Sequence, residues 1–117
     1  MAAMHHKGKI LGRELPRMEE FEANAFLDDF VVSEDPEKPI TAGLFRLEAG
    51  ESMTYTYTYH EIKLILDGEF QISDDTGQTV EATQGDLFYF PAGSTITFST
   101  PVFGLGYFVG QRGEGEA

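Results

Sequence analysis

Residues 53–59 alternate strictly between two kinds of side chain. After Met53, threonines stand at positions 54, 56 and 58, and tyrosines stand at positions 55, 57 and 59. A period of two in β-branched and aromatic residues is a strong strand signal, because successive side chains of a strand point to opposite faces. The segment therefore predicts a strand with three phenol rings on one face and three hydroxyl groups on the other.

Further strands are predicted along most of the chain, in short segments separated by glycine and proline turn signals. Asp67-Gly68 suits a tight hairpin turn, because glycine accepts a positive φ. Short strands at close and even spacing are typical of a sandwich or a barrel, so the chain is expected to be all-β. The expected strands cover residues 44–47, 62–66, 69–73, 78–82, 87–90, 94–99 and 102–109.

The two ends of the chain carry weaker signals. Residues 1–8 are expected to be disordered, and residues 111–117 are expected to form a flexible tail because they contain no apolar anchor. Residues 18–30 have some helix-compatible spacing, but the valines at positions 31 and 32 favour a strand. We expect irregular structure followed by a strand packed on a single domain over residues 9–110, since 117 residues suffice for one core.

Composition excludes several classes of function. The chain has no cysteine, which rules out disulfides and thiolate metal sites. A net charge of -12 argues against nucleic acid and anionic membranes as partners, because both bind basic surfaces. No stretch approaches the ~20 apolar residues of a membrane helix, and the first residues lack the apolar centre of a signal peptide. The expected location is the cytoplasm.

Two glycine-containing stretches resemble the paired motifs of the cupin superfamily. The first is Gly50-x4-Tyr55-x-Tyr57-x3-Glu61-x6-Gly68, and the second is Gly85-x5-Pro91-x-Gly93-x2-Ile96-x3-Thr100. The resemblance implies a cupin fold, a double-stranded β-helix or jelly-roll barrel. The usual cupin pattern has metal-binding histidines where this chain has Tyr55, Tyr57 and Ile96. We therefore expect no metal and no other cofactor.

A closer resemblance is to the EutQ-like cupins of ethanolamine utilisation, over about residues 41–109. This resemblance supports the fold more strongly than any activity, because one barrel carries many functions. Where that family tends to carry acidic residues, this chain has His60 and Lys63. The residues that carry the resemblance are Tyr59-His60-Glu61-Ile62, Gly68-Glu69, Gly85-Asp86, Pro91-Ala92-Gly93-Ser94 and Phe98-Ser99-Thr100-Pro101.

In the cupin frame the candidate site lies inside the barrel. Glu61 projects inward there, and alternation places Lys63 on the same face. The candidate catalytic residues are Glu61, Lys63, Tyr57, Tyr55 and His60. The candidate substrate-binding residues are Tyr59, Ile65, Phe88, Phe90, Ile96 and Phe98. Such mostly apolar walls with few polar groups suit a small organic molecule.

Each candidate also has a structural interpretation. Glu61 and Lys63 could form an internal ion pair, or Lys63 could extend to the barrel rim, instead of performing acid–base chemistry. Alternation puts His60 opposite Glu61, which favours a surface histidine over an interior proton shuttle. The tyrosines could simply fill the barrel, and the threonine row is expected on an outer face.

Three functions remain open from the sequence. The first is a metal-independent small-molecule enzyme that isomerises, dehydrates or cyclises a polar carbonyl compound, with Glu61 as acid or base. In that reading Tyr57 and Tyr55 hold or protonate the oxygen, and Lys63 stabilises negative charge. A less favoured alternative has Lys63 as a Schiff-base nucleophile, because burial lowers the pKa of a lysine. The second is a non-catalytic cupin that binds a ligand or serves as an accessory or assembly module. The third is a degenerate metal site on Glu61, His60 and tyrosine oxygens. An aromatic outer sheet face favours a homodimer.

Overall fold

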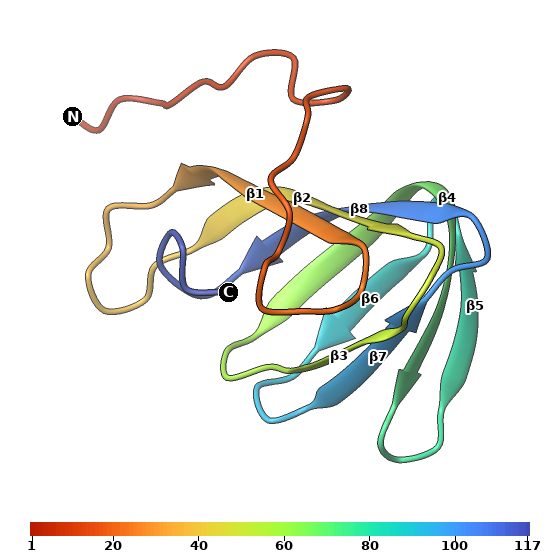
Figure 1. Ribbon diagram of the computed structural model, residues 1–117. Helices are drawn as coiled ribbons and strands as arrows, with labels where there is room; N and C mark the ends of the chain where they lie inside the picture. Colours follow the sequence, from red (N-terminus) through yellow and green to blue (C-terminus); the bar gives the residue numbers. More distant parts are fainter.

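The computed structural model describes residues 1–117 and consists of strands, turns and irregular segments, with no helix. Every strand pair is antiparallel. The strands form a strongly curled arrangement (Figure 1). They are β1 (Ala25–Val32), β2 (Thr41–Glu48), β3 (Met53–Thr56), β4 (Glu61–Asp74), β5 (Thr79–Thr83), β6 (Leu87–Phe90), β7 (Thr95–Ser99) and β8 (Phe103–Gly110).

The longest strand, β4, belongs to two sheets. Its first half, residues 61–68, pairs with β8, and residues 61–64 also pair with β6. Its second half pairs with β5 and β7. One sheet therefore has the order β1-β2-β8-β4-β6 and the other the order β5-β4-β7-β3. This arrangement confirms the predicted all-β jelly-roll barrel.

The hairpin predicted at Asp67-Gly68 is wrong, because β4 continues through both residues. Gly68 has a φ of 67°, and the register with β8 shifts between Ile65 and Asp67. A β-bulge uses the same left-handed glycine as a tight turn, so the local sequence signal is shared. Any side chain at position 68 would also collide with the carbonyl oxygen of Phe103. The bulge lies where β4 passes from one sheet to the other.

The core lies between the two sheets and is mostly aromatic. Phe45, Phe70 and Phe98 are each 1% exposed, and the ring centroids of Phe45 lie 6.0 Å from Phe70 and 5.4 Å from Phe98. Gly104 of β8 makes room for the Phe70 ring, because a Cβ there would overlap it. Large rings from three strands thus fill the barrel, and Gly104 leaves the space that the Phe70 ring occupies.

The N-terminal region is irregular up to β1, as predicted, and part of it packs on the barrel. The Arg17 guanidinium donates to the carbonyl oxygens of Phe21 and Ala23 at 3.1 Å each. This compact loop buries Met18 and brings the Phe21 ring to 6.3 Å from the Tyr55 ring. The first strand, β1, is longer than predicted, because it begins at residue 25 and not near residue 30.

The outer face of the sheet carries apolar side chains where β8, β4 and β6 lie together. Leu64 lies beside Tyr107 on β8 and Leu87 on β6, and Ile62 lies beside Tyr89. Leu87 and Tyr89 are 68% and 55% exposed. An outer sheet face with exposed aromatic and apolar side chains was expected from the sequence. The homodimer that it favours stays a prediction. None of the elements is a helix of the length and apolarity needed to cross a membrane.

Candidate functional site

Three polar side chains meet in the interior of the barrel. Glu61 and Lys63 project inward from β4, and each is only 4% exposed in its side chain. Their Oε2 and Nζ atoms lie 3.3 Å apart, and the Tyr57 hydroxyl donates to the same Oε2 at 2.6 Å. The structure thus brings together three of the predicted catalytic residues in one buried hydrogen-bonded group.

Tyr57 reaches this group although it lies beyond the end of β3. A strand was predicted over residues 53–59, but β3 ends earlier, because its pairing with β7 stops at Thr56. The backbone of Tyr57 then exchanges hydrogen bonds with the turn after β6, donating to Ser94 at 2.8 Å and accepting from Gly93 at 2.7 Å. The turn therefore holds the tyrosine in place where the β3–β7 ladder no longer does.

Aromatic rings surround the ammonium group of Lys63. Its Nζ lies 4.3 Å from the centroid of the Phe45 ring, 4.6 Å from Phe98 and 5.8 Å from Phe90. These contacts attract a cation through the negative ring faces. Burial nevertheless lowers the pKa of Lys63 below its ordinary value, and the neighbouring Glu61 carboxylate offsets only part of that effect.

The remaining two tyrosines of the row form a second polar group. The hydroxyl oxygens of Tyr55 and Tyr59 lie 3.0 Å apart, and the ring of Tyr55 packs edge-on against Tyr57 at 4.7 Å. Burial raises the pKa of all three phenols above the ordinary value, and the Glu61 charge adds to the effect. The phenols therefore stay neutral and can donate hydrogen bonds at physiological pH.

The space left beside these groups is small. A cavity of about 20 Å³ touches Glu61, Lys63 and the three tyrosines. That volume suits roughly one water molecule. The ligand pocket expected from the sequence is therefore reduced to this small space, because large rings fill the barrel. The other lining residues are Met18, Leu27, Phe45, Met53, Phe98 and Ala117.

His60 lies outside the barrel, on the opposite face from Glu61. It is exposed, and its Nδ1 accepts from the Ala92 backbone N–H at 3.2 Å and lies 2.9 Å from the Tyr89 hydroxyl oxygen. Strand alternation predicted this orientation. The interior group therefore consists of Glu61, Lys63 and the tyrosines, and His60 is not a member of it.

The predicted substrate-binding residues separate into two places. Tyr59 and Phe98 line the small cavity, and Phe90 stacks on the Tyr57 ring at 5.1 Å. Phe88 and Ile96 instead lie, with Phe90, along a groove of about 350 Å³ between β6 and the second sheet. Ile65 is fully buried in the core and lines neither space.

Several residues of the site escaped sequence reasoning. Phe45 contacts Lys63 from β2, far away in the sequence. Gly106 of β8 faces the Lys63 stem, since a Cβ there would lie 3.2 Å from its Cγ and Cδ. The alternating glycines at positions 104 and 106 are a signal that could have located this neighbour, because an inward-facing glycine marks a close approach.

A second buried ion pair lies at the same end of the barrel. The Arg112 guanidinium donates to both oxygens of Asp29 at 2.9 Å each, and the two side chains are 3% and 7% exposed. Burial alone would lower the pKa of Arg112, but hydrogen bonds to Asp29 outweigh it and raise the pKa. Gly115 also donates to Asp29, at 2.8 Å. Arg112 is thus a polar anchor for residues 111–117, which lack an apolar one; their flexibility stays a prediction.

The interior does not fit the metal that cupins usually hold. No group of three histidine, cysteine, aspartate or glutamate side chains lies close enough to bind an ion. Glu61 already accepts from Tyr57 and contacts Lys63, while His60 lies outside. The phenols, with raised pKa values, are poor ligands in their neutral form.

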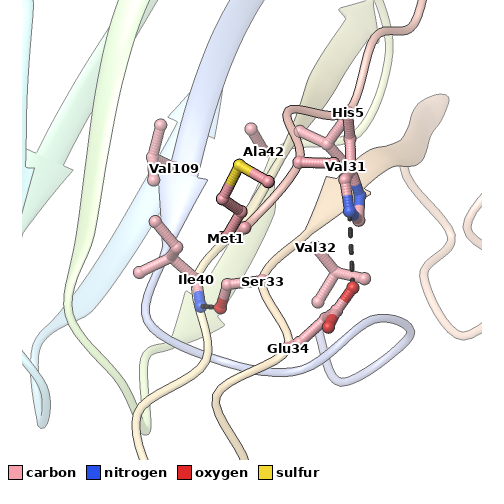
Figure 2. Close-up of a pocket in the computed structure, with 11 residues that line it drawn as sticks. Met1, His5, Val31, Val32, Ser33, Glu34, Ile40, Ala42 and Val109 are labelled. Carbon is pink, nitrogen blue, oxygen red and sulfur yellow. Dashed lines mark hydrogen bonds and ion pairs between the residues drawn. The ribbon is translucent and has the colours of Figure 1, made fainter.

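Another hollow lies on the outer surface, away from the polar interior. Figure 2 shows Met1 among Val31, Ala42 and Val109, with the His5 ring directed toward Glu34. The hollow has a volume of about 600 Å³, and the His5–Glu34 pair is 3.4 Å long and solvent-exposed. Its walls are mostly apolar side chains, and its polar groups are Ser33 and the exposed His5–Glu34 pair, so it adds no chemistry to the interior group.

Comparison with known proteins gives concordant similarities in sequence. Residues 14–109 match the family model described as "Ethanolamine utilisation protein EutQ". The chain is 33% identical over 75 residues to a protein of Salmonella typhimurium named "Acetate kinase EutQ", covering 64% of this chain. The match covers 31% of that protein, so the chain spans about a third of the length of this curated relative.

Solved structures agree with the fold. The crystal structure of a putative ethanolamine utilization protein q from Salmonella typhimurium is similar with a TM-score of 0.73 and 28% identity, over 86% of this chain and 80% of that one. An RmlC-like cupin from Shewanella frigidimarina is similar in fold with a TM-score of 0.70 and 15% identity, over 92% of this chain and 90% of that one. The predicted cupin fold is thereby confirmed.

Proposed function

The chain belongs to the EutQ family of cupin-fold proteins, and we propose that its interior site transfers protons on a small carbonyl compound without a metal. The specific reaction would be an isomerisation, a dehydration or a cyclisation, all of which can begin with removal of a proton next to a carbonyl. Glu61 would act as the base and Lys63 as the positive charge that stabilises the developing oxyanion.

One observation carries the proposal, namely the buried Glu61–Lys63–Tyr57 group. A buried ion pair is a poor way to stabilise a fold, because apolar side chains of similar volume often serve as well or better. Both side chains here are 4% exposed and face a cavity lined mainly by apolar residues. Ionisable groups held in an apolar interior are candidates for chemistry on that physical ground.

The proposed first step uses groups that already contact one another. The Glu61 carboxylate takes a proton from the carbon beside the carbonyl, and the C–H electrons form the carbon–carbon double bond of an enolate. The negative charge then moves to the carbonyl oxygen, where the Lys63 ammonium stabilises it. Returning the proton from Glu61 to a different atom of the substrate completes an isomerisation.

The phenols have different hydrogen-bonding capacity in this scheme. The single hydroxyl proton of Tyr57 is engaged by Glu61, so Tyr57 orients the base. The Tyr55–Tyr59 pair shares two hydroxyl protons and uses one of them between the two oxygens, which leaves one free to donate. This pair is therefore the better holder of the substrate oxygen.

A Glu61→Gln variant tests the proposal directly. We expect the wild-type protein to exchange the α-protons of small aldehydes or ketones in D₂O. The exchange rate of the variant should be lower by a factor of about 10²–10⁴, the typical contribution of a general base. Glutamine keeps the shape and can still accept from Tyr57. The measurement is the disappearance of the α-proton signal in ¹H NMR across a panel of carbonyl compounds.

Glu69→Gln is the matched control, because Glu69 lies on the same strand but is exposed. Its exchange rate should equal that of the wild type. Exchange that survives Glu61→Gln would contradict the proposed base. Ligand binding without any exchange by the wild-type protein would favour the alternative function, a non-catalytic cupin that binds a small molecule or serves as an accessory module.

The name of the relatives supplies a second candidate, acetate phosphorylation. It rests on the sequence similarity, and the matched region is only about a third of the Salmonella protein. A kinase site needs cations for the phosphate groups, and the two interior cations, Lys63 and Arg112, are each paired with a carboxylate. Formation of acetyl phosphate from ATP and acetate, trapped with hydroxylamine, tests this candidate on the chain as it stands.

A further inference from the structure

Lys63 differs from every other lysine of the chain in its surroundings. The chain has lysines at positions 7, 9, 38 and 63, and the first three are exposed. Lys63 is 3% exposed, and its Nζ contacts one carboxylate oxygen and the faces of aromatic rings. Lys63 is also one of the residues that line the interior cavity. The chain therefore holds one amine that is separated from solvent and adjacent to a free space.

The neighbours of this amine suit a nucleophile. A lysine desolvated in an apolar pocket keeps more of its amine in the neutral form, which is the form that attacks a carbonyl carbon. Burial lowers the pKa of Lys63 in this way. The Glu61 carboxylate, 3.3 Å away, can accept the proton that the amine releases. An attacking group and a proton carrier are thus already in contact.

We propose that Lys63 forms an imine with a short, uncharged aldehyde; this inference rests on the proposed function, because it uses the same carbonyl site, where Lys63 now acts as a neutral amine in place of the ammonium that stabilises an oxyanion. The lone pair of the Lys63 nitrogen attacks the carbonyl carbon, and the C=O π electrons move to oxygen. Glu61 takes a proton from nitrogen and delivers it to that oxygen, giving a carbinolamine. A second proton carried the same way releases water as the C–O bond breaks and the C=N bond forms.

The size and lining of the cavity select the aldehyde class. A space of about 20 Å³ has room for little more than a carbonyl group, so even a short aldehyde enters only as neighbouring side chains move, and most of those are apolar or aromatic. A carboxylated or phosphorylated carbonyl compound would add a charge, but Lys63 and Arg112 are already paired with carboxylates. The Tyr55–Tyr59 pair has one free hydroxyl proton for a single carbonyl oxygen. A short aliphatic aldehyde meets these requirements.

Reductive trapping tests the inference on the intact wild-type chain. The protein is treated with propanal and sodium cyanoborohydride near pH 7, and each lysine is then followed by peptide mass spectrometry. We expect Lys63 to gain a propyl group clearly faster than the exposed lysines, because its lowered pKa leaves a larger neutral fraction of the amine near pH 7. The advantage should shrink towards pH ~10.4, where exposed amines also lose their protons.

The exposed lysines are internal controls, so the result does not depend on a variant that folds. Lys63→Arg adds a charged control that should show no label at position 63, with labelling elsewhere unchanged. Equal labelling of all four lysines, or labelling confined to exposed ones, would overturn the inference. If Glu61→Gln abolishes α-proton exchange but Lys63 of the wild-type protein stays unlabelled, the proposed function stands and the imine is contradicted. If Lys63 of the wild-type protein is labelled but no α-proton exchange occurs, the imine stands and the proposed proton transfer is contradicted.

Discussion

Replacing Lys63 by methionine should destabilise the protein by about 3–5 kcal/mol, as is typical when one partner of a buried ion pair is removed. Methionine keeps most of the volume of the lysine stem. The Glu61 carboxylate, 4% exposed, would be left with the Tyr57 hydroxyl as its only hydrogen-bond partner. The measurement is the free energy of unfolding from urea denaturation at pH 7, with circular dichroism as the signal.

The double variant Glu61→Gln/Lys63→Met should recover that loss. With both charges removed, no buried charge remains uncompensated, and such replacements are often neutral or stabilising by about 1–4 kcal/mol. Tyr57 can still donate to the glutamine oxygen. A double variant as unstable as Lys63→Met would show that the lysine stabilises the fold through its stem, on Gly106 and the phenylalanine rings, and not through charge.

The pH dependence gives an independent check on Lys63. Because burial lowers its pKa in the folded state, the unfolded chain binds the lysine proton more tightly. Between the folded pKa and the unfolded value of about 10.4, unfolding therefore takes up protons, and stability should rise with pH. Lys63→Met should lose this contribution. If the free energy of unfolding of the wild type fell more steeply with pH over this range than that of Lys63→Met, the lowered pKa of Lys63 would be contradicted.

The second large effect is expected for Arg112→Met, again about 3–5 kcal/mol. This change removes both guanidinium contacts to Asp29, which is 7% exposed in its side chain. The remaining donor to Asp29 would be the Gly115 backbone N–H. Residues 113–117 would lose their anchor, so the cavity that Ala117 helps to line should open. We expect urea unfolding to show the loss of stability and propanal labelling of Lys63 to become faster.

Acid pH should reduce the cost of Arg112→Met. Burial opposes ionisation of Asp29, but the Arg112 hydrogen bond and the Gly115 N–H outweigh it and lower the pKa. The pair therefore contributes stability above the unfolded pKa of about 3.9, and this contribution disappears as pH falls through the lower folded pKa. The difference between wild type and variant should shrink below pH ~4. An unchanged difference there would mean that Arg112 acts by packing on Tyr59 and Phe108.

Local patterns in the sequence were sufficient for the fold class and for the direction of several side chains. Period-two alternation put Glu61 and Lys63 on one face and His60 on the other, and the structure has them so. The threonine row likewise lies outside, where Thr54 and Thr56 pair with Thr97 and Thr95 at 2.9 Å. Alternation is a property of the strand itself, so it survives without knowledge of any neighbour.

The tertiary structure alone decided what surrounds those side chains. The left-handed Gly68 was compatible with a turn or a bulge, and the choice depended on β8 and β7 pairing with the two halves of β4. The Asp29–Arg112 pair joins residues 83 positions apart. The volume left beside Lys63 depends on rings from several distant strands. Pairing, charge partners and free volume are non-local quantities, whereas strand periodicity and turn chemistry are local, and this difference separates what the sequence determined from what packing decided.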